Sequence, residues 1–575
     1  MDGTSLPPPF RASRTGWVWA HAPELLFALL LLAVLPMRDL WAPDEPDFAQ
    51  CVKEMRLRGD WLLPYLNGQP YSEKPILYYW VLKASSLGLD ALTGGLGFTQ
   101  GVAAWALRLP SVVAAVAFLS AYRRWALRFL DPELAGPAAL ILATTPLWFW
   151  QSQFIQIDLL FSALLAWSWL CWLGGYLLLR GPGEAAGSAE ARRWFLKAYL
   201  WLALAFLAKG PLAPVLSLLL LAAFLGWQRD LRILARTHLL AGLGLMLLLV
   251  APWYVAAGLK GGARYAYELI IFQNVERATH AWDHLQPWWK YGEYLVGDFF
   301  PWVLLLPALA LRLWRERHRL DPARRFLLLA FLVPFGFLSA VQSKQGKYLL
   351  MGYPFLALLL ADLACPREPL RARWQGVLLA LGLAIPAAAL AALLLGAGGP
   401  KVQGQIPPFL GPLRLMTLAL AGGASAVLIQ ALRGQALRGQ AARLVPSTAL
   451  SLGLCFLAGG TWGFRRLDPP KSYQRWTRAV QPLIAGRPVF YWQTLRSGVL
   501  VYTDHLMPEL RTAGALEALA PEARLVAQRD EWEQDAWGMT PALRARFEVI
   551  LSVPTGGDDI LLLKKRTNPV PEEAP

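Results

Sequence analysis

The chain has 575 residues, of which 56% are hydrophobic and only 16% are charged, and its formal net charge is +16. Soluble domains contain about 45–50% apolar and about 25% charged residues, so this composition excludes a chain of soluble domains and predicts an integral membrane protein. The basic residues stand in short clusters between apolar runs, which is where membrane topology places them. We therefore expect membrane lipids as partners and no nucleic acid.

The first apolar run extends from about Gly16 to Pro36 and follows Arg11 and Arg14. No small-x-small cleavage site comes after it, so we expect an uncleaved membrane span with a cytoplasmic N-terminus. Similar runs of roughly 20 residues, enough to cross a hydrocarbon core of about 30 Å, recur to near position 463 and predict about 13 spans. The predicted parts are a transmembrane domain at 1–463 and a soluble domain at 464–575.

The loops between these runs alternate in charge. One set is rich in Arg and is expected in the cytoplasm by the positive-inside rule. The other set is expected outside and comprises two long loops at about 37–103 and 259–298 and shorter ones near 151–158, 209–214, 343–348 and 396–408. The apolar stretch Ile76–Leu89 is interpreted as a juxtamembrane helix on the outer surface, because counting it as a span would place the Arg clusters outside.

Acidic residues mark two of the outer loops. Asp44, Glu45 and Asp47 follow the first span; a solvated acidic turn would also explain them, because Asp and Pro favour turns. Asp158 enters an apolar run, where a charge is expensive and usually faces a cavity, although a role as helix N-cap stays open. The alternation of the loops puts Asp44 and Asp158 on one membrane face, and we predict that they meet in one site.

Basic residues stand on the same face. Lys74 begins an aromatic stretch, where an ammonium and helix N–H groups can meet an anionic headgroup or where a lysine can simply snorkel; Lys209, at an outer helix end, has the same two interpretations. Glu73 and His284 are weak candidates for binding a divalent cation. A Glu73–Lys74 ion pair and a hydrogen bond from His284 are the simpler alternative. No other cofactor is expected.

After about Trp462 the composition changes to short β-rich runs that alternate with helical patterns. This spacing predicts a small α/β domain of about 100 residues outside the membrane. The predicted strands are Val489–Trp492, Gly498–Thr503, Leu525–Gln528, Phe547–Val553 and Asp559–Leu563, and the predicted helices are Pro508–Ala518 and Trp532–Trp537. Nothing in this domain assembles into a second active site, so no catalysis is assigned to it.

Short motifs occur along the membrane part in a characteristic order, namely Asp44-Glu45, Gly59-Asp60-Trp61, Asn67-Gly68, Glu73-Lys74-Pro75, Arg108-Leu-Pro, Asp158, Phe272-Gln-Asn-Val-Glu276-Arg277, His284-Leu-Gln-Pro287, Phe300-Pro301-Trp302 and Ser343-Lys344-Gln-Gly-Lys347-Tyr348. This order resembles the GT-C membrane glycosyltransferases, and within them the bacterial relatives of protein O-mannosyltransferases. About 13 helices and an outer α/β domain are most similar to the lipid A 4-amino-4-deoxy-L-arabinose transferases. Pro46 and Asp47 after the acidic pair, and Ile76 after Lys-Pro, depart from the family pattern.

The resemblance implies an inverting transferase of the bacterial inner membrane with its site facing the periplasm, an undecaprenyl-phosphate sugar as donor and lipid A as acceptor. Asp44 and Asp158 are the predicted catalytic residues, which align or deprotonate a nucleophile or orient the sugar. Lysine, arginine and tyrosine groups are predicted to stabilise the departing phosphate. The predicted substrate-binding residues are Glu45, Glu73, Lys74, Arg277, His284, Lys347 and Tyr348.

Three alternatives stay open at this point. The acceptor can be a protein or another envelope glycan instead of lipid A. A transporter or flippase of lipid-linked sugars also has many spans and membrane-embedded charges, but transporters commonly carry two-fold repeats with helices interrupted at the midplane, and no such repeat is visible here. A structural assembly protein is the third alternative, supported only by the C-terminal domain.

Overall fold

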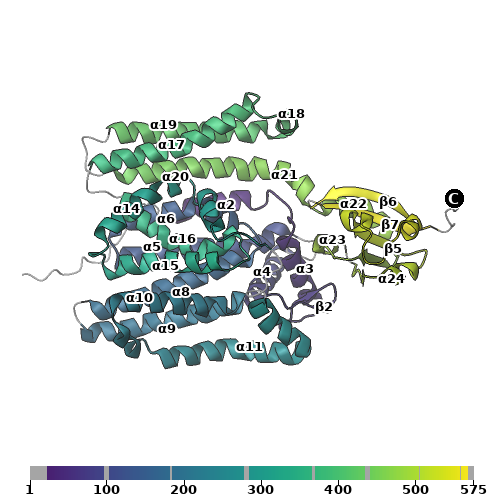
Figure 1. The fold of residues 1–575 in the computed structure, drawn as a ribbon, viewed down its shortest axis with the longest axis horizontal. Coiled ribbons are helices and arrows are strands. Elements are labelled where there is room, and N and C mark those ends of the chain that lie inside the picture. Colours follow the sequence, from purple (N-terminus) through teal and green to yellow (C-terminus); the bar gives the residue numbers. More distant parts are fainter. Residues whose placement is uncertain are drawn as a thin grey trace, which may run out of the picture.

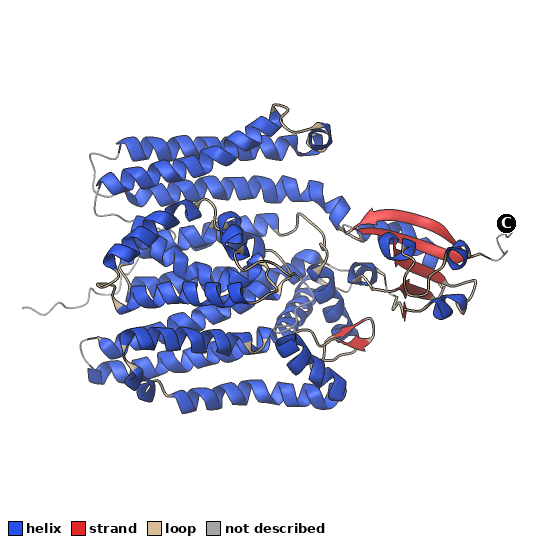
Figure 2. Cartoon of the chain, in the orientation of Figure 1, coloured by secondary structure: helices blue, strands red, loops and turns tan. Residues whose placement is uncertain are grey.

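The computed structural model describes residues 22–95, 103–181, 184–276, 284–364, 369–433, 441–503, 505–556 and 558–566. Long helices lie side by side and form a bundle, and a smaller domain sits at one end of it (Figure 1). Among the residues in these ranges, strands occur in this domain and in one short hairpin beside the bundle (Figure 2). The architecture is therefore a helical bundle with a mixed C-terminal domain.

In the described part of the chain, 8 helical segments are long and apolar enough to cross a membrane, or up to 9 if a bent pair counts as one span. The bent pair joins α13 (Lys290–Asp298) to η3 and α14 (Trp302–Glu316) at an angle of 113°. Three apolar helices are shorter, and α9 (Glu184–Lys209) packs against α8. The protein is thus a polytopic helical membrane protein. The long segments are α5 (Ala104–Phe129), α8 (Ile157–Arg180), α11 with η2 (Leu239–Tyr267, Glu268–Glu276), α15 (Pro322–Ala340), η4 with α16 (Gly346–Gly352, Tyr353–Ala364), α17 (Pro369–Leu394), α19 (Leu410–Arg433) and α20, η6, α21 and α22 (Ala441–Ala458, Gly459–Gly463, Phe464–Lys471, Gln474–Ile484); the short ones are α2 (Ala22–Val34), α6 (Pro132–Ala143) and α10 (Leu212–Gln228).

Helix α8 lies in the centre of the bundle, since 89% of its apolar window is buried, a larger share than in the other candidate spans. Two adjacent glycines allow this close packing. A Cβ atom on Gly174 would lie 3.0 Å from the ring of Phe129, and one on Gly175 would lie 3.0 Å from the ring of Phe195. The first turn of α8 is buried as well, since Ile157, Asp158 and Leu159 are 3%, 4% and 0% exposed, so close packing restrains the position of Asp158.

The loop predicted to be the first outer loop folds onto the end of the bundle that carries the C-terminal domain (Figure 1). It contains α3 (Asp44–Leu57), a hairpin of β1 (Tyr65–Leu66) and β2 (Gln69–Pro70), and α4 (Leu77–Thr93). Helix α4 covers the stretch expected to form a juxtamembrane helix and is not among the candidate spans of the described residues. The buried Lys83 of α4 donates hydrogen bonds to the carbonyls of Met55 and Asp60 at 3.0 and 2.7 Å and so ties α4 to the end of α3.

The C-terminal domain contains a 5-stranded sheet in the order β4-β3-β5-β7-β6. Strand β3 runs parallel to β4 and β5, and β7 runs antiparallel to β5 and β6. Alternate residues of the strands enter two buried clusters, for example Val526 and Leu562 on one face and Leu525 and Leu561 on the other. Both faces are therefore covered. The strands are β3 (Val489–Trp492), β4 (Glu509–Leu510), β5 (Arg524–Gln528), β6 (Phe547–Thr555) and β7 (Asp558–Lys565), and the short helices are α23 (Ser497–Tyr502), α24 (Ala513–Glu517), α25 (Arg529–Glu533) and α26 (Pro541–Ala545).

Three predictions for this domain were wrong. The stretch Gly498–Thr503, predicted as a strand, is the helix α23; Pro508–Ala518, predicted as one helix, is β4 followed by α24; and the helix expected at Trp532–Trp537 ends at Glu533. In α23 the consecutive residues 499–501 are all buried and Gly498 packs so tightly on Tyr473 that a Cβ atom would lie 2.2 Å from its ring. Packing on all sides overrides the β propensity of the Val-Leu-Val sequence.

Candidate functional site

Two predicted acids meet at the end of the bundle that carries the C-terminal domain. Asp44 is the first residue of α3, and Asp158 lies in the first turn of α8. Lys347, in η4, lies between them: its Nζ is 2.8 Å from Asp44 Oδ2 and 3.8 Å from Asp158 Oδ2. Three segments that the loop alternation assigned to one membrane face therefore contribute to one cluster.

A second lysine completes the cluster. Lys209, the last residue of α9, donates a hydrogen bond to Asp158 Oδ1, and its Nζ lies 4.3 Å from the centroid of the Tyr348 ring. The half-buried Lys74 adds a longer-range attraction to Asp158. The side chains of Asp158 and Lys209 are 5% and 13% exposed, so mobile ions screen their interaction little. Lys347 and Lys209 thus contact the two carboxylates directly, and Lys74 adds a third positive charge nearby, so the cluster offers ammonium groups to an anion.

Asp44 is the acid of this cluster that reaches solvent, with a side chain 34% exposed. Besides Lys347 it is contacted by Gln156, whose Nε2 donates to Asp44 Oδ2. Gln156 was not predicted as a site residue. Its only signal in the sequence is its position two residues before Asp158, at the end of the same outer loop.

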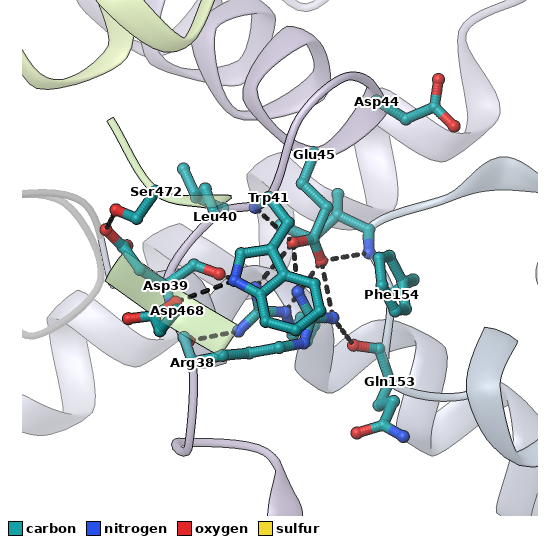
Figure 3. A network of polar contacts seen from close by, with 12 residues as sticks. Arg38, Asp39, Leu40, Trp41, Asp44, Glu45, Gln153, Phe154, Asp468 and Ser472 are labelled. Carbon is teal, nitrogen blue, oxygen red and sulfur yellow. Dashed lines mark hydrogen bonds and ion pairs between the residues drawn. The ribbon is translucent and has the colours of Figure 1, made fainter. Parts of the chain in front are cut away.

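Glu45, the neighbour of Asp44, has a wholly different environment (Figure 3). Its carboxylate is fully buried and accepts hydrogen bonds from Arg38 at 2.6 Å and from Arg108 at 2.7 and 2.8 Å, and from the backbone N–H groups of Trp41 and Ile155 at 2.9 and 3.1 Å. Burial acts to raise the pKa of Glu45, but the two arginines outweigh it and hold the pKa at about 2. Figure 3 shows the side chain of Asp44 pointing away from this network.

The arginine network joins the segments that carry the two acids. Arg38 donates to the carbonyl of Gln153 at 2.8 Å, and Glu45 accepts from Ile155 in the same loop, just before Asp158. Arg108 donates in turn to the carbonyl of Arg38 at 2.8 Å. Arg38 and Arg108 were not predicted as site residues. Arg108 nevertheless carries the same sequence signal as Asp158, because both are charged residues at the start of an apolar run.

The remaining predicted residues lie around this cluster or outside the described chain. Glu73 is exposed, and His284 is exposed with its carbonyl accepting a hydrogen bond from the Lys344 N–H at 3.0 Å. Arg277 lies outside the described residues. Among the residues that the structure describes, no group of 3 or more His, Cys, Asp or Glu side chains could hold a metal ion. The divalent cation at Glu73 and His284 stays a prediction.

Comparison with known proteins identifies the family. A profile of the dolichyl-phosphate-mannose-protein mannosyltransferases (PMT) matches residues 25–261, a range that includes Asp44, Lys74, Asp158 and Lys209. An undecaprenyl phosphate-alpha-4-amino-4-deoxy-L-arabinose arabinosyl transferase of Pseudomonas paraeruginosa is 33% identical over 419 residues, which cover 71% of this chain and 70% of the relative. This chain belongs to the PMT family of GT-C glycosyltransferases. It is therefore an enzyme that takes its sugar from a polyprenyl-phosphate donor.

Solved structures share the fold of this glycosyltransferase. ArnT from Cupriavidus metallidurans, in a crystal structure with undecaprenyl phosphate bound, superimposes with a TM-score of 0.72 at 20% sequence identity, over 96% of this chain and 98% of that one. The apo oligosaccharyltransferase of Archaeoglobus fulgidus gives a TM-score of 0.52 at 10% identity, over 90% of this chain and 70% of that one. The predicted GT-C-like bundle with a C-terminal domain is confirmed at the level of the fold.

Proposed function

We propose that this glycosyltransferase moves 4-amino-4-deoxy-L-arabinose from undecaprenyl phosphate to a phosphate of lipid A, at the periplasmic face of a bacterial inner membrane. The observation that carries the proposal is the contact of Asp44 and Asp158 through Lys347 at the outer end of the bundle. The name of the matched relative supports the sugar and its lipid carrier. The resemblance in motif order supports lipid A as the acceptor.

The proposed topology has 13 spans and places the site outside. The long apolar helices, the bent pair, the three shorter apolar helices and α9 together supply this number. An odd number of spans with the N-terminus inside puts the C-terminal domain in the periplasm. The proposed boundary at 463/464 coincides with the start of α21 at Phe464.

The lysines serve the leaving group in the proposed reaction. An oxygen of the acceptor phosphate attacks the anomeric carbon, the bond from that carbon to the undecaprenyl phosphate oxygen breaks, and its electron pair stays on the departing phosphate. Because the leaving group gains a negative charge, ammonium groups bind it more tightly in the transition state than in the bound donor. Lys347, Lys209 and Lys74 fill this role, together with Tyr348 and Arg277, and a single displacement inverts the anomeric centre.

The carboxylates serve the sugar. A phosphate monoester has a second pKa of about 6 and is largely a dianion at pH 7, so the acceptor needs no general base. We assign Asp44, the more exposed acid, to the sugar, where it orients hydroxyl and amino groups and balances positive charge at the anomeric carbon. Asp158 holds Lys209 and Lys347 in place. Glu73 and His284 remain candidates for substrate contacts. We interpret Glu45 as a positioning residue, because its buried carboxylate is already bound by two arginines and two backbone N–H groups.

The test is transfer by the purified protein in lipid nanodiscs, with the undecaprenyl-phosphate aminopentose and lipid A, followed by mass spectrometry of lipid A. We expect the mass of lipid A to rise by one aminopentose residue, and Asp158→Asn to abolish the rise. In a second preparation, the protein is placed in sealed vesicles. Movement of the donor lipid between the two leaflets without sugar transfer would identify a transporter instead. Transfer to an added protein, with lipid A unmodified, would overturn the proposed acceptor.

A further inference from the structure

The C-terminal domain touches the first outer loop just before the acidic residues. Asp39 accepts hydrogen bonds from the hydroxyls of Ser472 and Tyr502. Asp468, in α21 at the start of the C-terminal region, accepts from the Trp41 indole N–H and from the Asp39 N–H, both at 2.8 Å. Asp39, Asp468 and Ser472 lie together on one side of the Glu45 network (Figure 3). The chain leading to Asp44 is therefore held by residues of the C-terminal region.

A second set of contacts holds the helix that begins with Asp44. Helix α23 of the C-terminal domain packs on α3. Ser497 donates a hydrogen bond to Asp47 Oδ1, and Lys53 of α3 donates to the carbonyl of Val501 at 3.1 Å. Asp44 and Asp47 are three residues apart and so lie on the same side of the first helical turn. The C-terminal domain thus contacts the turn that carries the proposed catalytic acid.

A third attachment uses the Asn67-Gly68 motif, for which the transfer reaction provides no role. The side-chain amide of Asn67 pairs with the backbone of Met507, donating to its carbonyl at 2.8 Å and accepting from its N–H at 2.9 Å. The adjacent Gly68 N–H donates to Glu54 of α3 at 2.9 Å. The hairpin therefore links a further segment of the C-terminal domain, between α23 and β4, to α3.

The environment of Asp47 explains why this docking matters for the first turn of α3. Burial, and then the negative charges of Glu73 and Asp44, raise the pKa of Asp47 well above its ordinary value, whereas Arg496 of the C-terminal domain acts in the opposite direction. Without the Ser497 hydroxyl, this carboxylate would lose a hydrogen bond, while burial and the repulsion of Glu73 and Asp44 would remain. It would then turn toward water and draw the first turn of α3, with Asp44, away from Lys347.

We propose that the C-terminal domain positions the transfer site: Ser497, Tyr502 and the Asn67–Met507 pair fix the first outer loop so that Asp44 stays in contact with Lys347. This inference rests on the proposed role of Asp44 in transfer. Ser497, Tyr502 and Asn67 are positioning residues, which act on the reaction through α3 and do not contact the substrate.

The experiment compares Ser497→Ala with Ser497→Thr, which keeps the hydroxyl, and with the matched control Ser552→Ala. Ser552 is a serine of the same domain whose hydroxyl bonds only Arg529 and Asp559 among the described residues, at 2.9 Å each. For Ser497→Ala we expect kcat to fall about 10- to 100-fold, as misplacement of a reacting group does, with the KM for the lipid donor unchanged and faster amide hydrogen exchange in α3. Ser497→Thr restores kcat, and Ser552→Ala changes neither quantity.

An unchanged kcat in Ser497→Ala would overturn the inference, and so would a rise in the KM for lipid A alone, which would make the domain an acceptor-binding module. Tyr502→Phe, which keeps the ring and removes the hydroxyl bonded to Asp39, provides a second variant if Ser497→Ala does not fold. If the wild-type protein transfers no sugar, the proposed function fails, but amide hydrogen exchange still tests whether the C-terminal domain holds α3 in place. Equal exchange rates in α3 of Ser497→Ala and of the wild type would overturn the inference.

Discussion

Asp44 and Glu45 are neighbours in the sequence and have opposite environments. The side chain of Asp44 is 34% exposed and contacts Gln156 and a lysine, whereas Glu45 is fully buried between two arginines and two backbone N–H groups. A carboxylate whose hydrogen-bonding positions are occupied by the protein cannot exchange them for a substrate. The difference supports our proposal that Asp44 serves the chemistry while Glu45 holds the segments that carry the site.

The largest effect is expected for Glu45, the buried acid, and concerns the stability of the protein. Glu45→Gln removes the carboxylate that Arg38 and Arg108 share in a buried site, and removing one partner of a buried ion pair costs about 3–5 kcal/mol. We expect a markedly lower Tm in detergent, measured by a fluorescence melt, or failure to accumulate. Glu548→Gln, which removes one partner of an exposed pair with Lys564, is the control and should cost less than about 1 kcal/mol. Equal Tm values for the two variants would contradict a structural role for Glu45.

The second-largest effect is expected when Lys347, the cation between the two acids, is replaced. Lys347→Met leaves Asp44 and Asp158 facing each other and takes one donor from the leaving phosphate, and the loss of one such donor typically lowers the rate about 10²–10³-fold. The measurement is the initial rate of aminopentose transfer at saturating donor. Lys401→Met, at an exposed position in α18 (Pro400–Gln403), should leave the rate unchanged. A Lys347→Met enzyme with the wild-type rate would remove Lys347 from the mechanism.

A smaller effect is expected at Gln156. Its amide orients Asp44, and a hydrogen bond to a charged group contributes about 1.5–3 kcal/mol. We expect Gln156→Ala to reduce kcat about tenfold while the Tm stays near that of the wild type, because Asp44 retains Lys347. A large loss of Tm with normal transfer would instead place Gln156 with Glu45 in the structural network.

The smallest effect concerns Asp47 and depends on pH. Because burial and the neighbouring acids raise the pKa of Asp47 above its ordinary 3.8, the ionised form is less favourable in the folded than in the unfolded protein. Its contribution to stability is therefore highest at low pH and falls as pH rises from the unfolded toward the folded pKa. Asp47→Asn should raise the Tm at pH 7, and this gain should shrink toward pH 4. A lower Tm at pH 7 would show that Arg496 and Ser497 fully compensate the charge.

The sequence predicted the parts of the fold that depend on local pattern. Apolar runs and the alternation of charged loops predicted the helical bundle and the helix α4, because the length of a run and the cost of moving charge across the membrane act locally. Helix α23 was predicted as a strand because its form depends on packing against Tyr473 and α3, which adjacent residues do not encode.

The site was predictable to the same extent. Asp158 could be recognised because an acid in an apolar run needs a partner. The alternation of the loops predicted that it lies on the same membrane face as Asp44 and Lys347. The split between Asp44 and Glu45 was not predictable, since it depends on Arg108, which is 63 positions from Glu45 in the chain. The docking contacts at Asp39 and Asn67 span more than 430 positions, and no local pattern reports them.

The most direct test measures transfer to lipid A and Tm side by side for Asp44→Asn and Glu45→Gln. We expect Asp44→Asn to have the Tm of the wild type and to transfer at most about one hundredth as fast, as for loss of a group acting in the transition state. We expect Glu45→Gln to have a lower Tm and to lose activity because it unfolds. Full transfer by Asp44→Asn, or a stable Glu45→Gln protein that is inactive, would contradict this division of roles between the two acids.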